Sequence, residues 1–422
     1  MRNTGYFKGK RVAVAGLARS GLASANLLYD LGAQVYVSDN QDNDLTRANA
    51  EELKSKEIKV ELGRHSEDFI KDKDLLVLSP GVPNEAPPVV LAQRFKIPII
   101  SEIEFAWILC PSTVIAVTGS NGKTTVTTLI GKILEAEGKR VFILGNIGKP
   151  FSGAVDKMSE KDFVALEVSS FQLESIQSFK PKVCVILNIT PNHLDRYRNM
   201  QEYLEAKKRI FMNQDKSDHL VLNHDDPVLR DFAGETKAQV VYFSQENGLN
   251  PNQAAVLAVG SVLGIKKDLC LKVFSEFKGV EHRQEFVTKI NNISFINDSK
   301  ATTVESAMYA LNNIDSPIIL IAGGKDKGLD YSVILDLARR KVKEVVLIGE
   351  ARQKIREAFK GMLPIHEAGT LEDAVKLAFN RSKSGDCVLL SPMCSSFDMF
   401  SDYEERGRVF KKAVLDLVKR KG

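Results

Sequence analysis

A short segment near residue 120 combines the residue types that bind phosphate in proteins. It reads IAVTGSNGKTT, from Ile115 to Thr125, and an apolar strand pattern leads into it. Gly119 and Gly122 permit a tight turn whose backbone N–H groups, together with Lys123, converge at the start of a helix. This pattern predicts a triphosphate site, and the hydroxyl of a following threonine could reach Mg²⁺.

The loop departs from the common Walker A spelling, which is G-x-x-x-x-G-K followed by serine or threonine. Val117 stands where that spelling has its first glycine. A simple turn between a strand and a helix is therefore the alternative to a shortened phosphate-binding loop.

A second glycine-containing turn, GLARSG from Gly16 to Gly21, follows the strand pattern VAVA. Asp39 ends the next strand pattern, as the acidic residue of a dinucleotide-binding fingerprint does. Ala18 replaces the middle glycine, which normally permits the closest approach of a pyrophosphate. Three interpretations stay open: a nucleotide diphosphate of another kind, a nicotinamide dinucleotide, or a structural turn.

Charged side chains also stand where later strand patterns end. Glu167 closes the apolar run FVALE, and a buried carboxylate is costly unless it is paired, hydrogen-bonded or bound to metal. Glu167 is therefore a candidate Mg²⁺ ligand. His193, in TPNHLDRY, could be a second ligand or an ordinary loop histidine. Lys207, in EYLEAKKRIF, reads most simply as part of a solvated helix face.

The last third of the chain carries basic and hydroxyl groups that could bind an anionic substrate. They lie in the segments HRQE, NDSKATT, AGGKDKGLD and SPMCSSFDMF. The candidates are Arg283, Asp298, Lys300, Thr302, Lys327 and Ser396.

Short apolar runs alternate with amphipathic stretches along the whole chain. The runs include RVAVAG, DLLVLSPG, STVIAVTG, FVALEV, VCVILN, PIILIAGG, EVVLIG and DCVLLSP. This rhythm predicts an α/β fold with parallel strands and crossover helices, whose carboxyl edges are where ligands bind. Restarts of the rhythm divide the chain into three domains, residues 1–101, 102–280 and 281–422.

The composition excludes several classes of protein. The chain has 422 residues, of which 44% are hydrophobic and 27% charged, as in a globular protein. Its net charge of +4 is spread along the sequence, which does not favour nucleic acid as a partner. No apolar run reaches about 18 residues, and the start lacks the pattern of a signal peptide, so we expect a cytoplasmic protein without a membrane partner. The five cysteines lack metal-site spacing, and we expect Cys184 and Cys387 to be buried thiols.

Eight spaced motifs resemble the Mur ligases of peptidoglycan synthesis. In order they are TGSNGKTT, LGNIG, LEVSSFQLE, LNITPNHLDRY, EAKKRI, EHRQE, NDSKATT and SPMCSSFDMFSDYEERG. The resemblance spans nearly the whole chain, and SSFQLE and SPMCSSFD are most similar to the branch that adds D-glutamate to UDP-N-acetylmuramoyl-L-alanine. TGSNGKTT follows the shorter spelling that this family uses for ATP.

The resemblance implies three domains and a reaction. The N-terminal domain would be Rossmann-like, the central one P-loop ATPase-like with a parallel or mixed sheet, and the C-terminal one a Rossmann-like α/β domain that closes on ATP. ATP, with one or two Mg²⁺ ions, would activate the L-alanine carboxylate as an acyl phosphate, which the amine of D-glutamate attacks. The substrates would be small molecules, and we expect the chain to act as a monomer.

The resemblance also implies roles for individual residues. Lys123, Glu167, His193 and Lys207 would be catalytic. ATP would contact Gly119, Asn121, Gly122, Lys123, Thr124, Thr125, Asn252, Arg283 and Asp298. The UDP-sugar would contact Ser20, Asp39, Asn40, Ser79, Asn146 and His193. D-Glutamate would contact Lys300, Thr302, Lys327, Ser396 and Tyr403. Mg²⁺ would be held by Thr124, Glu167, His193 and Lys207, the last as a carbamate.

The chain departs from the family pattern in three places. Gln41 stands where an arginine near the uracil is common, and Tyr403 stands where a phenylalanine is common. Only ten residues separate Val241 from Asn252, where relatives carry additional strands. A nicotinamide-dependent oxidoreductase and a non-enzymatic nucleotide-binding regulator are the alternative functions, and the first leaves the segment GSNGKTT unexplained.

Overall fold

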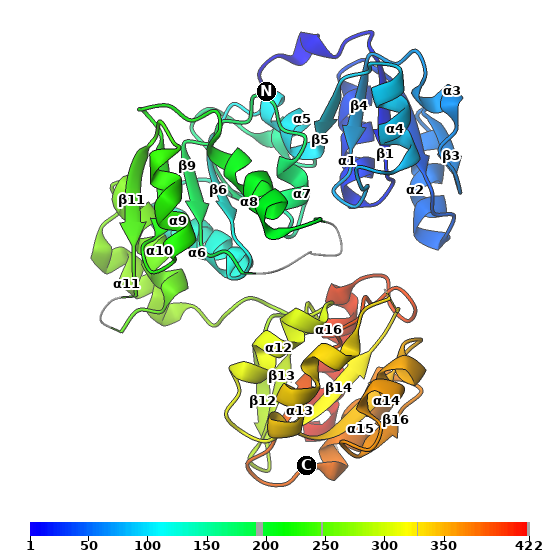
Figure 1. Ribbon diagram of the computed structural model, residues 1–422, viewed down its shortest axis with the longest axis vertical. Helices are drawn as coiled ribbons and strands as arrows, with labels where there is room; N and C mark the ends of the chain where they lie inside the picture. The colour runs from blue at the N-terminus through cyan, green and yellow to red at the C-terminus, as the bar shows by residue number, and fades with distance from the viewer. Residues whose placement is uncertain (191–196, 246–247, 327, 420–422) are drawn as a thin grey trace. The chain divides into compact units, whose positions relative to one another are not determined.

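Figure 1 shows the computed structural model, which describes residues 1–190, 197–245, 248–326 and 328–419. The chain forms two compact units, Met1–Phe277 and Lys278–Gly422. The first unit contains two sheets and the second contains one. The predicted α/β class with three sheets is therefore confirmed, while the domain boundaries at residues 101 and 280 stay predictions.

The N-terminal sheet has the strand order β3-β2-β1-β4-β5 and parallel pairing. Its strands are β1 (Arg11–Ala15), β2 (Gln34–Asp39), β3 (Lys59–Leu62), β4 (Leu75–Leu78) and β5 (Ile99–Ser101). Its helical segments are η1 (Thr4–Tyr6), α1 (Arg19–Asp30), α2 (Asp44–Lys54), α3 (Glu67–Ile70) and α4 (Pro87–Arg94). The strand order reverses between β1 and β4, which is where an open α/β sheet binds its ligand.

The central sheet has the order β11-β10-β9-β6-β8-β7, also with parallel pairing. Its strands are β6 (Thr113–Thr118), β7 (Val141–Gly145), β8 (Phe163–Glu167), β9 (Val183–Ile186), β10 (His219–Asn223) and β11 (Gln239–Phe243). The longer helices are α5 (Glu102–Leu109), α6 (Lys123–Ala136), α8 (Met200–Lys208), α10 (Pro251–Val262) and α11 (Lys267–Glu276). The short segments are η2 (Val155–Lys157), α7 (Ser170–Leu173), η3 (Arg209–Phe211), α9 (Pro227–Asp231) and η4 (Phe232–Gly234).

Helix α6 follows β6 directly and packs closely on the central sheet. Gly131 of α6 lies against β7, since a Cβ there would be 2.4 Å from Cδ1 of Ile143. Buried Val126 and Ile130 share one apolar cluster with residues of α10 and α11. The helix start that follows the glycine turn is therefore fixed by the core.

The C-terminal sheet has the order β12-β13-β17-β14-β15-β16. Its strands are β12 (Glu285–Ile290), β13 (Ile293–Asn297), β14 (Ile318–Gly323), β15 (Val342–Ile348), β16 (Ile365–Glu367) and β17 (Cys387–Leu390). Its helical segments are α12 (Val304–Asn312), η5 (Tyr331–Ile334), α13 (Leu335–Lys341), α14 (Arg352–Phe359), α15 (Leu371–Arg381) and α16 (Tyr403–Lys419). Leu320 of β14 packs with α12, α13 and α14 on one face, and its neighbours Ile319 and Ile321 pack with α15 and α16 on the other.

This sheet is mixed, because β12 pairs with β13 in antiparallel fashion. Asn291 and Asn292 join the two strands with φ angles of 49° and 63°. Positive φ at both central residues is the geometry of a tight hairpin turn, which asparagine tolerates. The parallel arrangement expected from the strand patterns therefore does not extend to this edge.

The cysteines behave as expected, since all five are buried and free. Within the described ranges, none of the helices combines the length and the apolar character needed to cross a bilayer.

Candidate active site

The predicted phosphate-binding segment forms a tight turn at the start of α6. Gly122 is the N-cap of the helix with φ of 83°, and Gly119 has φ of 148°. Both values lie where a side chain would be strained, which explains why the segment has glycine at these two positions. Nζ of Lys123 donates to the carbonyl oxygens of Gly119 and Ser120, both at 2.9 Å, so its ammonium group folds over the turn.

Residues that follow β9 brace this loop from one side. Oδ1 of Asn188 accepts from the backbone N–H of Asn121 at 2.8 Å, and the backbone oxygen of Asn188 accepts from Ser120 N at 3.0 Å. The Ser120 hydroxyl donates to the carbonyl of Thr190 at 3.0 Å. The loop is thus shaped by its own protein contacts, and a preformed turn at a helix N-terminus suits an anion.

Asn252 reaches the loop in spite of the short connection that precedes it. Helix α10 begins at Pro251, and its N-cap Asn250 forms a capping box with Gln253. A Cβ at Gly122 would lie 2.4 Å from Oδ1 of Asn252. The short connection therefore still delivers the predicted ATP-contacting amide to the phosphate loop.

Glu167 lies at the carboxyl edge of the same sheet. It is level with Val117 of β6 and with Gly145 of β7, and only 1% of it is exposed. Nδ2 of Asn146 donates to its Oε1 at 3.1 Å. Gly145 has no room for a side chain, since a Cβ there would lie 2.2 Å from the Glu167 carbonyl oxygen. The segment GNIG thereby holds Asn146 on the candidate metal-binding carboxylate.

Lys207 is buried beside the loop, so the interpretation as a solvated helix face is wrong. It is 1% exposed, and its Nζ donates to the carbonyl oxygen of Gly119 at 3.0 Å. Burial and the nearby charge of Lys123 lower the pKa of Lys207 well below its usual range. Helix α8 therefore presents to the phosphate loop an amine whose charged form is disfavoured.

Tyr203 lies one turn before Lys207 on α8 and was not among the predicted site residues. Its hydroxyl is 3.0 Å from Oγ of Ser120, and burial raises the pKa of Tyr203 to about 12. The ammonium of Lys207 lies 4.7 Å from the centre of the Tyr203 ring. The spacing of four along the helix, which puts both side chains on one face, was the available signal.

Several polar side chains lie at the carboxyl edge of the N-terminal sheet. Asp39 accepts from the backbone N–H groups of Leu17 at 2.5 Å and Gln41 at 2.7 Å. The Ser79 hydroxyl donates to the carbonyl of Gly16 at 3.1 Å, across the point where the strand order reverses. Two further predicted UDP-contacting residues lie at this edge, Ser20 in the first turn of α1 and Asn40 directly after β2.

In the second unit, Arg283 lies between two residues in the left-handed region. His282 has φ of 63° and Gln284 has φ of 46°. The backbone N–H of Gln284 donates to Oδ1 of Asp298 at 3.1 Å, and the Ser391 hydroxyl donates to Oδ2 at 2.9 Å. Burial raises the pKa of Asp298 to about 7, against the opposing effects of these hydrogen bonds and of Arg283.

Four of the five predicted D-glutamate residues lie in the described part of this second unit, Lys300, Thr302 and Ser396 on loops and Tyr403 at the start of α16. Nζ of Lys300 is 5.8 Å from the ring centre of Tyr403, and the Tyr403 carbonyl accepts from the Ser299 hydroxyl at 2.8 Å. Thr302 donates its backbone N–H to the carbonyl of Lys300 at 2.9 Å. Ser396 is 2% exposed. The fifth, Lys327, and the predicted metal ligand His193 lie outside the described residues.

Arg406 joins these loops and was not predicted as a site residue. It is 1% exposed, and its guanidinium donates to the backbone oxygens of Ser299, Cys394 and Ser395 at 2.8 to 3.2 Å. Burial lowers its pKa to about 10. The available signal was its spacing of four from buried Phe410, which puts a cation on the apolar stripe of α16.

Comparison with known proteins covers the chain almost from end to end. Residues 10–101 match the family described as Mur ligase MurD-like, N-terminal domain. Residues 117–279 match the Mur ligase middle domain, and residues 282–394 match the Mur ligase glutamate ligase domain.

Curated relatives match at similar coverage. A UDP-N-acetylmuramoylalanine--D-glutamate ligase of Thermoanaerobacter pseudethanolicus is 42% identical over 97% of this chain and 99% of that protein. The protein of the same name from Clostridioides difficile is 40% identical over 97% of this chain and 99% of its own length.

Solved structures share the fold at lower identity. The UDP-N-acetylmuramate-alanine ligase MurC of Thermotoga maritima aligns with a TM-score of 0.60 at 21% identity, over 96% of this chain and 99% of that chain. MurF ligase from the same organism, solved in complex with ADP, aligns with a TM-score of 0.58 at 17% identity, over 99% and 97%. Because three family domains follow in order and relatives above 40% identity match along 97% of its length, the chain belongs to the Mur ligase family.

Proposed function

We propose that the chain joins D-glutamate to the L-alanine carboxylate of UDP-N-acetylmuramoyl-L-alanine, with ATP as the energy source, in cytoplasmic synthesis of a peptidoglycan precursor. The observation that carries the proposal is the preformed glycine turn at the start of α6, with Lys123 folded over it and Lys207 beside it. The names of the relatives above 40% identity supply the identity of the two substrates.

The residues at the carboxyl edge of the central sheet fit a triphosphate with Mg²⁺. Buried Thr124 offers a hydroxyl and buried Glu167 a carboxylate, which are the hard oxygen donors that Mg²⁺ prefers. We assign these two residues, together with His193, to hold the metal ion. When bound, the ion would neutralise phosphate oxygens and so favour nucleophilic attack on phosphorus.

Lys207 would complete this donor set as a carbamate. Its lowered pKa favours the neutral amine, which is the form that attacks the carbon of CO2 and then loses a proton to solvent. The product carries a negative charge, so the repulsion between the ammonium groups of Lys123 and Lys207 becomes an attraction. Its oxygens would give Mg²⁺ a ligand that the amine cannot provide.

The remaining residues divide between two substrates and the nucleotide. Ser20, Asp39, Asn40, Ser79 and Asn146 would bind the UDP-sugar. Lys300, Thr302, Lys327, Ser396 and Tyr403 would bind D-glutamate, whose two carboxylates suit lysine and hydroxyl partners. Asn252, Arg283 and Asp298 would contact ATP.

The chemistry requires two negatively charged groups to approach each other. A carboxylate oxygen of L-alanine would attack the γ-phosphorus, ADP would leave, and the amine of D-glutamate would then displace phosphate from the acyl carbon. Lys123 at the loop would offset the charge on the phosphate oxygens, and the fixed loop would hold the reacting groups in line. The amine must lose a proton before or during its attack.

An ADP-release assay tests the proposal directly. Purified protein with ATP, Mg²⁺ and UDP-N-acetylmuramoyl-L-alanine is given each of a panel of D- and L-amino acids. We expect ADP release with D-glutamate and none when either the acceptor or the amino acid is omitted. Release that needs neither substrate, or that prefers another amino acid, would overturn the proposed function.

A further inference from the structure

The residues on both sides of Arg283 are held in an unfavourable backbone conformation. Positive φ at His282 and Gln284 is uncommon for residues with a side chain, so tertiary contacts must hold this turn. Residues 282–284 are named the 282–284 turn below. Its amide groups are held by Glu285, which accepts from His282 N at 2.9 Å, and by Asp298, which accepts from Gln284 N.

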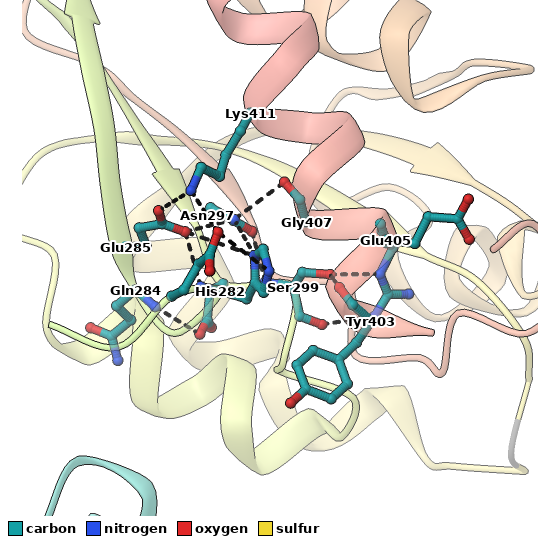
Figure 2. Close-up of polar contacts among 12 residues, drawn as sticks. His282, Gln284, Glu285, Asn297, Ser299, Tyr403, Glu405, Gly407 and Lys411 are labelled. Carbon is teal, nitrogen blue, oxygen red and sulfur yellow. Dashed lines mark hydrogen bonds and ion pairs between the residues drawn. The ribbon is translucent and has the colours of Figure 1, made fainter. Parts of the chain in front are cut away.

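The carboxylate of Glu285 is the centre of these contacts, as Figure 2 shows. Its Oε2 accepts from His282 N and also from Nδ2 of Asn297 at 3.0 Å. Its Oε1 accepts from Nζ of Lys411 at 2.5 Å. Lys411 belongs to α16 and also donates to Oε1 of Glu281 at 2.9 Å. The ion pair therefore connects the C-terminal helix to the carboxylate that fixes the turn.

The imidazole of His282 fits the same arrangement. Its Nδ1 lies 2.9 Å from Nδ2 of Asn297, and because an amide nitrogen only donates, Nδ1 accepts and the ring is neutral. Burial lowers the pKa of His282, in agreement with a neutral ring. On α16, Gly407 leaves room for the imidazole, since a Cβ there would lie 2.2 Å from Nδ1.

Glu281, His282 and Glu285 also place three possible metal-ligand atoms within 4.8 Å of one another. The ammonium group of Lys411 already lies against both carboxylates. Lys411 offsets one of the two negative charges and already contacts Oε1 of each carboxylate, so the cluster reads as an ion-pair network rather than a metal site.

We propose that Glu285 and Lys411 are positioning residues that set the 282–284 turn and thereby aim Arg283 at the nucleotide. This inference rests on the proposed function, which assigns Arg283 and Asp298 to ATP. Asp298 holds the far end of the same turn, so the ion pair and the buried carboxyl fix it from opposite sides. Neither Glu285 nor Lys411 needs to touch a substrate.

The change Lys411→Met tests the inference, because it keeps the aliphatic stem and removes the charge. We expect the KM for ATP to rise about tenfold, with the KM for D-glutamate changed less than about twofold. In Lys411→Arg the KM for ATP should stay close to that of the wild type, since arginine can keep the ion pair. Lys412→Met is the matched control, because Lys412 is the exposed neighbour on the same helix.

Hydrogen exchange gives a second readout that does not depend on turnover. The amides of His282 and Gln284 should exchange faster in Lys411→Met than in the wild type or in Lys412→Met. Gly407→Ala should produce the same selective rise in the KM for ATP by displacing His282. Gly369→Ala is its control, since a Cβ at Gly369 meets no atom within 4 Å.

The outcomes separate the inference from the proposed function. A wild-type protein without D-glutamate-dependent ADP release would overturn the function. With an active wild type, an unchanged KM for ATP in Lys411→Met and Gly407→Ala would overturn the positioning role alone. Equal rises in both KM values would also overturn it, because they would indicate a general loss of structure.

Discussion

The side chains of Lys123 and Lys207 donate to one acceptor, the carbonyl oxygen of Gly119, at 2.9 and 3.0 Å. Two ammonium groups so close repel each other, and burial adds to the cost of a charge on Lys207. Beside the phosphate-binding turn, burial and the charge of Lys123 thus favour the neutral form of Lys207. A neutral amine is what a carbamate requires.

The change Lys207→Ala should lower turnover by at least about a hundredfold, since it removes the carbamate that would hold a Mg²⁺ ion at the phosphate. If the modified lysine serves as a carboxylate, added formate or acetate should recover part of the activity. Steady-state ADP release with increasing carboxylate concentration measures the recovery. Lys208→Ala is the control, because Lys208 pairs with Glu205 and Glu235 away from the loop. Full activity of Lys207→Ala without rescue would contradict the assignment.

The two ends of α6 offer a matched pair of glycine substitutions. Gly122 and Gly138 have φ of 83° and 78°, so alanine should cost each about 1–2 kcal/mol of stability through backbone strain. Only at Gly122 does the new Cβ meet Asn252, at 2.4 Å from Oδ1. We therefore expect similar losses in thermal midpoint, but a rise in the KM for ATP only in Gly122→Ala. An equal KM for ATP in both variants would show that the contact with Asn252 is irrelevant to nucleotide binding.

The buried carboxyl of Asp298 should make the stability of the second unit depend on pH. Its pKa is about 7 in the folded protein, against 3.8 for an ordinary aspartate. Between these values the folded state binds the proton more tightly than the unfolded state. The stabilisation is therefore complete below about pH 4 and is lost as the pH rises through 7.

Asp298→Asn replaces the carboxyl with an uncharged group of the same shape and should remove this dependence. The difference in unfolding free energy between the variant and the wild type should grow with pH by up to about 1.4 kcal/mol per unit. Calorimetry without nucleotide, at pH 5 and pH 8, measures it. The exposed Asp336 gives the control substitution Asp336→Asn. A difference that does not grow with pH would mean that Asp298 is ionised throughout.

The parts of the fold and site that sequence predicts are those with a local signal. The strand before Lys123 and the glycines around it lie within a dozen residues, so their pattern alone indicates the turn. The antiparallel β12 had a local signal too, the pair Asn291 and Asn292 between two short apolar runs. It was missed because the recurrent buried runs favoured parallel strands throughout.

Other parts of the site depend on contacts between residues that are far apart in the sequence, and no local sequence pattern predicts these contacts. Lys207 looks like a surface residue among the charges of EAKKRI, and its burial follows only from where α8 packs against the loop. The pair of Glu285 and Lys411 is separated by 126 residues. Such partners are chosen by tertiary structure, and the sequence gives no means of pairing them.

The last prediction concerns Arg406, whose guanidinium group connects two loops that carry residues predicted to bind D-glutamate. It donates to the backbone of Ser299, which precedes Lys300, and of Ser395, which precedes Ser396. In Arg406→Lys, a single ammonium cannot reach the same set of acceptors. Each buried carbonyl left without its donor costs about 1–3 kcal/mol, so the variant should be less stable but folded.

We expect Arg406→Lys to raise the KM for D-glutamate about tenfold, while the KM for ATP changes less than about twofold. This selectivity is the reverse of that expected for Lys411→Met, although both residues belong to α16. Arg408→Lys, at an exposed position of the same helix, is the control. Because the two variants change different side chains of one helix, a general loosening of α16 would raise both KM values in both. Opposite selectivity would instead show that the helix holds the amino-acid loops and the nucleotide turn through separate side chains.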